Sequence, residues 1–143
     1  MFDSSHFHPM IVHFPIALIM VGFIADLFSL FLSKKEPSLS KIGFYLMILG
    51  TLGAIAAFLT GEFFTTKKIG EAGLVLAQHE MFAKITMGIM IFASIFRIYL
   101  VIAKKENSAL KYFVILLIAI AAATVSYTGF LGGNLVYNFM IGL

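Results

Sequence analysis

Apolar residues form four long blocks, and the charged residues lie almost entirely between them. The blocks cover residues 9–32, 42–64, 81–103 and 112–131, and the charges gather in the separators 33–41, 61–80 and 104–111. Each block has about 20 residues or more, enough to cross a hydrocarbon core of about 30 Å at about 1.5 Å per residue. A buried helix of a soluble protein would be shorter and would carry a polar face. The pattern therefore predicts four transmembrane helices.

Short separators between four such blocks favour one compact unit. We expect an all-α protein, an integral membrane four-helix bundle that forms a single four-span domain over residues 1–143. No internal repeat is evident. Residues 70–78 stay apolar and compatible with a helix, so two arrangements are open. Either the third helix begins well before residue 81, or a short helix lies along the membrane surface.

The distribution of lysines predicts the orientation in the membrane. The first and third separators carry Lys34, Lys35, Lys41, Lys104, Lys105 and Lys111, whereas the second carries only Lys67 and Lys68. Short loops rich in Lys and Arg remain in the cytoplasm. We therefore expect a multi-pass protein of the bacterial inner membrane, with both termini on the outer, periplasmic side.

Composition narrows the chemistry. Of the 143 residues, 61% are hydrophobic and only 12% are charged, against about 25% charged in an ordinary soluble domain, which argues against a soluble enzyme. The absence of cysteine excludes disulfides, thiolate metal sites, iron–sulfur clusters and thioether-attached haem. No basic stripe with interleaved aromatics suggests nucleic-acid binding. No hydrolase, kinase or nucleotide motif occurs, and enzymatic activity is left open.

The histidines all fall at the outer end of the expected bundle. His13 lies inside the first block, His79 opens the third helix, and His6 and His8 precede the first block. Ionisable residues within membrane spans are costly and usually mark a site or a pair. Glu62 ends the second block on the same side, where it either faces water or accepts a hydrogen bond from a ligand histidine.

Two charges lie deep within the spans, at matching depth. Asp26 follows His8 by 18 residues, and Arg97 follows His79 by 18 residues, which is five helical turns or about 27 Å. The first and third helices run in the same direction, so Asp26 and Arg97 should lie near the same inner boundary. They either form an ion pair or extend separately to the headgroups.

Two terminal motifs resemble those of a bacterial family of small membrane proteins, the domain-of-unknown-function family numbered 2231. The opening HPMIVHFPIAL at residues 8–18 resembles the family pattern of His-Pro, two or three apolar residues and His-Phe-Pro-Ile-Ala. The closing GGNLVY at residues 132–137 resembles its Gly-Gly-x-Leu-Val-Tyr. Thr60, Gly61, Glu62 and His79 also fit, so the resemblance covers nearly the whole chain.

The resemblance implies redox or haem-related work, and it emphasises His8, His13 and His79 without naming their task. The tail departs from the family pattern, which often continues with a basic residue, His and Gly. Asn138, Phe139 and Met140 stand there instead. A role of a tail histidine therefore does not transfer to this chain.

Three functions are compatible with these residues. The first is a small b-type cytochrome that carries electrons in the membrane, with non-covalent haem b held by histidines. The second is a zinc- or copper-binding protein, or a metalloenzyme assembly factor, that uses His8, His13, His79 and Glu62. The third is a structural accessory subunit of a larger membrane complex.

Within the haem hypothesis, His79 is the firmest ligand and His13 is its expected partner, with His8 as the competing candidate. Lys67, Lys68 or Lys84 would offset the charge of the propionates. The bilayer is the first partner of such a chain. The redox partner is open between quinone and a larger redox complex, and a homo-oligomer is compatible with the sequence.

Overall fold

The computed structural model describes residues 7–32, 34–64, 68–106 and 108–140. For Phe7 and Phe64 it describes the backbone only. Four helices account for nearly all of these residues: α1 (Phe7–Leu32), α2 (Ser38–Phe64), α3 (Gly70–Ile102) and α4 (Ala109–Phe139). Each helix is long and apolar enough to cross a membrane. The prediction of an all-α, four-span architecture is confirmed.

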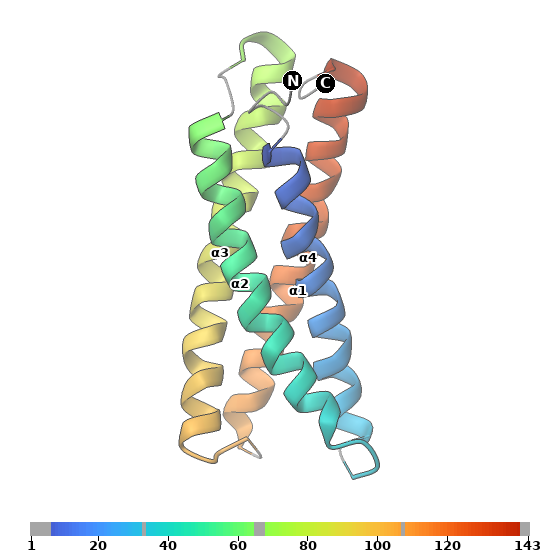
Figure 1. Ribbon diagram of the computed structural model, residues 1–143, viewed down its shortest axis with the longest axis vertical. Helices are drawn as coiled ribbons and strands as arrows, with labels where there is room; N and C mark the ends of the chain where they lie inside the picture. Colours follow the sequence, from blue (N-terminus) through green and yellow to red (C-terminus); the bar gives the residue numbers. More distant parts are fainter. Residues whose placement is uncertain (1–6, 33, 65–67, 107, 141–143) are drawn as a thin grey trace.

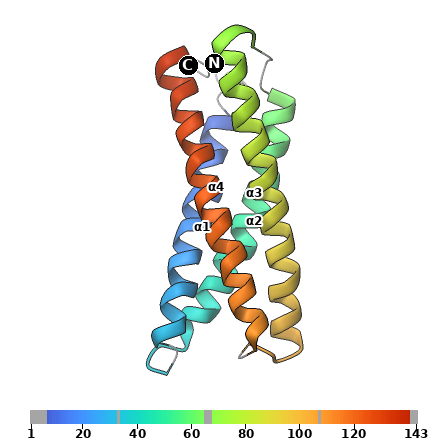
Figure 2. The same ribbon diagram turned by 180° about the vertical axis from the view of Figure 1, so that it is seen from behind.

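The helices run alternately up and down, so the two ends of the bundle differ (Figure 1). We call the end where α1 begins and α4 ends the terminal end. The opposite end, which carries the exposed Lys34, Lys35, Lys104 and Lys105, is the lysine end. Figure 2 shows that α3 and α4 project beyond α1 and α2 at the terminal end.

Two helices are longer than their apolar blocks predict. The third helix begins at Gly70, which decides between the two expected arrangements in favour of a continuous α3 of 33 residues. The fourth helix continues to Phe139 rather than ending near residue 131. No proline interrupts this stretch, and the helix ends only at Met140, whose left-handed backbone directs its N–H to the Val136 carbonyl oxygen.

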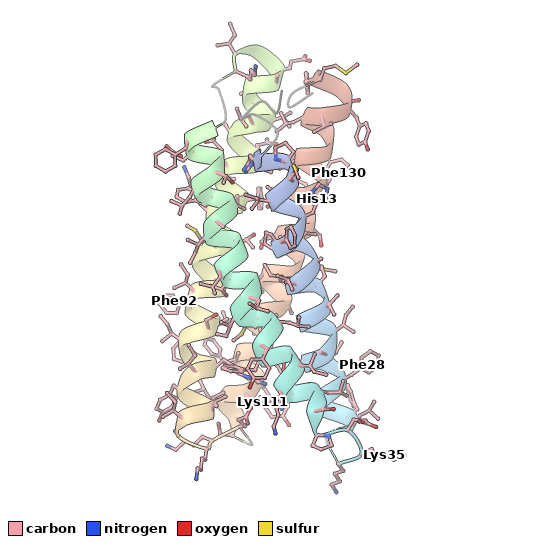
Figure 3. The ribbon with its side chains drawn as sticks, in the orientation of Figure 1. His13, Phe28, Lys35, Phe92, Lys111 and Phe130 are labelled. Atoms are coloured by element: carbon pink, nitrogen blue, oxygen red, sulfur yellow. The ribbon has the colours of Figure 1, made fainter. Side chains whose placement is uncertain are left out.

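The four helices form two hairpins. Helix α1 packs most extensively against α2, and α3 against α4, while contacts of α1 with α4 and of α2 with α3 are fewer. The deepest part of the core lies between the hairpins, where Ile19, Met47, Met90 and Ile118 are almost fully buried. Large aromatic side chains such as Phe28, Phe92 and Phe130 point outward instead (Figure 3). An apolar exterior of this kind faces lipid.

Candidate functional site: an imidazole pair at the terminal end

The rings of His8 and His79 come together at the terminal end of the bundle. Their centroids are 6.2 Å apart, and their planes are perpendicular at 89°. His8 lies in the first turn of α1, and His79 lies nine residues into α3. Two histidines from different hairpins thus lie at the same depth, and α3 continues for more than two turns beyond its histidine.

His79 is held in one tautomer by a backbone oxygen. Its Nδ1 lies 3.0 Å from the carbonyl oxygen of Thr128 on α4. A carbonyl oxygen only accepts, so Nδ1 carries the hydrogen and donates it. The other ring nitrogen, Nε2, therefore keeps a lone pair, and no described residue donates to it. This is the arrangement of a metal-ligating histidine, whose second nitrogen is oriented by a backbone acceptor.

His8 has a similar partner on α2. Its Nδ1 lies 3.2 Å from the hydroxyl oxygen of Thr60. That hydroxyl donates its own hydrogen to the carbonyl oxygens of Ala56 and Ala57, each 3.0 Å away. We therefore assign the hydrogen between the two side chains to Nδ1 of His8. Nε2 of His8 then also carries a free lone pair.

Both imidazoles line one cavity of about 640 Å³ in the terminal half of the bundle. All four helices contribute to it, and much of its wall consists of small residues, among them Ala54, Ala57, Gly61, Ala83, Gly129 and Gly132. Its polar rim includes Glu62, Lys68, Glu80 and Lys84, all of which are exposed. The volume lies within the range of small-molecule and cofactor sites.

The structure brings His8, rather than His13, to His79. His13 also lines the cavity, but its side chain is exposed and its Nδ1 donates to the Pro9 carbonyl oxygen, 2.7 Å away. His13 is five positions after His8 along the helix, so its side chain is turned by about 140° around the axis. The ring pair therefore corresponds to the competing candidate, and His13 lies toward the terminal end of α1 (Figure 3).

Other expected site residues do not join the ring pair. Glu62 is exposed at the rim of the cavity. Over the described part of the chain, no three His, Asp or Glu side chains gather in a way that would hold a metal ion. The expected lysines Lys68 and Lys84 line the cavity. His6 and Lys67 lie outside the described residues.

A buried ion pair occupies the lysine end of the same two helices. The Arg97 Nη2 atom lies 3.0 Å from Asp26 Oδ1, and both side chains are fully buried. The same nitrogen donates to the backbone oxygen and the hydroxyl of Ser40, at 3.0 Å and 2.8 Å. The expected Asp26–Arg97 pair is confirmed, and separate extension to the headgroups is wrong. Gly43 makes the approach feasible, because a Cβ there would lie 2.6 Å from the Asp26 carboxyl carbon.

The two hairpins share a pattern, in which the role of the threonines was not predicted from the sequence. The first helix of each carries a histidine that is followed 18 residues later by a charge of the ion pair. The second helix of each hairpin contacts that histidine through the threonine of a Thr-Gly pair, Thr60–Gly61 in α2 and Thr128–Gly129 in α4. The hydrogen bonds identify both threonines as partners of the imidazoles, Thr60 through its hydroxyl and Thr128 through its carbonyl oxygen.

Comparison with known families supports the membrane assignment. No curated protein and no solved structure matches the chain. A family model described as "Predicted membrane protein (DUF2231)" matches residues 5–143. That match covers nearly the whole chain, including the imidazole pair and the ion pair. The chain therefore belongs to the DUF2231 family of predicted membrane proteins.

Proposed function

We propose that this protein binds haem b between its two hairpins and carries electrons in the membrane. One observation carries the proposal: His8 and His79 meet across the cavity with both Nδ1 atoms engaged by the helices behind them. The two Nε2 lone pairs then have no donor among the residues that the structure describes. Such a site favours an electron-pair acceptor that takes one imidazole from each side.

The spacing of the rings suits one iron atom. A metal bound by two imidazoles at about 2 Å from each nitrogen, with each nitrogen about 1 Å from its ring centre, separates the centroids by about 6 Å. The separation in the structure is 6.2 Å. A tetrahedral ion needs further ligands, and no third His, Asp or Glu joins the pair among the described residues. The geometry therefore supports a planar macrocycle with two axial histidines over a bare zinc or copper ion.

The cavity supports the same ligand. Its small wall residues leave room for a flat apolar ring, and Lys68 and Lys84 at the rim offset the charge of carboxylates that point outward. The chain contains no cysteine, so attachment is non-covalent. A bound haem would supply reversible one-electron chemistry at its iron. Quinone of the bilayer or a larger redox complex is the proposed electron partner.

The test is the absorption spectrum and haem content of the full-length protein, purified with haem supplied during expression. We expect about one haem per chain, with the spectrum of a six-coordinate low-spin iron. His8→Ala and His79→Ala should lose that spectrum while the protein still inserts into the membrane. His13→Ala is the matched control, and it should keep the low-spin spectrum.

The opposite pattern of haem loss among the histidine variants would identify a different ligand pair. Loss of the spectrum in His13→Ala, with retention in His8→Ala, would assign the ligand pair to His13 and His79. A wild-type protein that stays colourless with haem supplied would overturn the proposal. Stoichiometric zinc or copper in that colourless protein would then favour the metal-binding alternative.

A further inference from the structure

The two imidazoles are packed against glycine as well as hydrogen-bonded. A Cβ on Gly61 of α2 would lie 2.9 Å from Cε1 of His8, closer than real side chains approach. A Cβ on Gly132 of α4 would lie 3.3 Å from Cε1 of His79. Each ring therefore lies directly against the backbone of the neighbouring helix. Any larger residue at these two positions would push the ring away.

Each ring is thus restrained at two points. For His8, the Thr60 hydroxyl holds Nδ1 and Gly61 contacts the Cε1 edge. For His79, the Thr128 carbonyl holds Nδ1 and Gly132 contacts the Cε1 edge. A hydrogen bond and a steric contact together restrict rotation about the Cβ–Cγ bond. The planes of the two restrained rings lie at 89° to each other.

We infer that Thr60, Gly61 and Gly132 are positioning residues that keep two axial imidazoles perpendicular to each other. The inference rests on the proposed function, because the axial role belongs to haem. It goes beyond that function by assigning the ring orientation, and with it the electronic state of the iron, to residues of α2 and α4. The restraint is already present in the protein alone, so the rings do not need to turn when the ligand enters.

Ring orientation has a distinct spectroscopic consequence. Parallel imidazole planes split the two iron orbitals that interact with the ligand π systems, which yields a rhombic low-spin EPR spectrum. When the planes are perpendicular, each imidazole π system interacts with one of the two orbitals, so the two orbitals remain nearly degenerate. The ferric spectrum then becomes strongly anisotropic and is dominated by one large g value. The geometry of this site corresponds to the second case.

The experiment compares ferric EPR spectra of the full-length, haem-loaded protein and three threonine variants. The wild type is expected to show the strongly anisotropic signal. Thr60→Val keeps the shape but removes the acceptor for His8, so its signal should shift toward the rhombic type at unchanged haem content. Thr60→Ser retains the hydroxyl and should restore the wild-type signal. Thr51→Val is the matched control, because Thr51 is also on α2 but bonds to Met47 and Ser94.

A second measurement needs no ligand. Histidine ¹⁵N NMR of the ligand-free protein distinguishes the two ring tautomers, and we expect His8 and His79 to carry hydrogen on Nδ1. Thr60→Val should change the tautomer population of His8 only. Gly132→Ala should alter the His79 signal and leave that of His8 in place.

The outcomes separate the two proposals. Absence of haem from the wild type overturns the proposed function. Haem binding with a rhombic wild-type signal, or with identical signals from wild type and Thr60→Val, overturns the assignment of the positioning residues alone. A ligand-free His8 with hydrogen on Nε2 also contradicts it.

Discussion

Replacing Asp26 by Asn tests the buried ion pair most directly. Asparagine has nearly the same shape, so the change removes the charge and leaves the packing in place. Asp26 and Arg97 are both fully buried at 3.0 Å, and among the described residues only Glu106, 3.6 Å away and 42% exposed, offers Arg97 another carboxylate. An uncompensated buried charge of this kind costs about 3–5 kcal/mol. We expect Asp26→Asn to lower the free energy of unfolding by that amount.

The reciprocal change is Arg97→Met, which replaces the guanidinium by an apolar chain of similar length. It leaves Asp26 unpaired and should cost about as much. In the double variant neither charge remains, so it should be more stable than either single variant. The expected coupling energy is at least about 2 kcal/mol.

Unfolding is measured by titration with sodium dodecyl sulfate in mixed micelles and followed by far-UV circular dichroism, since the chain has no tryptophan. Glu36→Gln is the control, because Glu36 is exposed in the turn at the lysine end and should shift stability by less than about 0.5 kcal/mol. The coupling would be refuted if the stability loss of the double variant equals the sum of the two single losses within about 0.5 kcal/mol.

Two further predictions concern packing and orientation. Gly43→Ala should destabilise the protein by about 1–3 kcal/mol, because its Cβ would lie 2.6 Å from the Asp26 carboxyl carbon. A Cβ on Gly88 would have no neighbouring atom within 4 Å, so Gly88→Ala should be neutral or stabilise the protein by up to about 1 kcal/mol. A Gly88→Ala variant that is less stable than Gly43→Ala in the same titration would contradict this packing. A reporter fused after Leu143 should be active outside the cytoplasm, as the lysine-rich loops predict, and cytoplasmic activity would invert the orientation.

The spans could be predicted from the sequence because hydrocarbon selects long apolar runs directly. Two helix ends could not be predicted in this way. α3 begins at Gly70 and α4 ends at Phe139, so both extend well past the apolar blocks. Outside hydrocarbon, apolarity no longer marks where a helix stops. The helix continues until a residue such as Met140 adopts a left-handed backbone conformation.

The imidazole pair could have been predicted from the same 18-residue spacing that predicted the ion pair. Eighteen residues make five turns, so His8 lies on the same face of α1 as Asp26, and His79 on the same face of α3 as Arg97. Once Asp26 faces Arg97, His8 must face His79. The 18-residue spacing gives direction around the helix as well as depth, and direction favours His8 over His13 as the partner of His79. The contacts of Gly61 and Gly132 with the rings depend on how neighbouring helices pack, and a single sequence does not specify that.

The two polar pairs also set the thickness of bilayer that the bundle fits. They stand 18 residues apart on each of two parallel helices, which corresponds to about 27 Å and approaches the thickness of a hydrocarbon core, about 30 Å. The ion pair joins α1 to α3 at one end and the two rings pack against each other at the other end, so both helices are expected to respond to a mismatch together. A thicker membrane would draw one pair into lipid, and a thinner one would expose apolar turns to water. Each ångström of mismatch costs a fraction of a kcal/mol, so the bundle is expected to thin or thicken the lipid around it before it deforms.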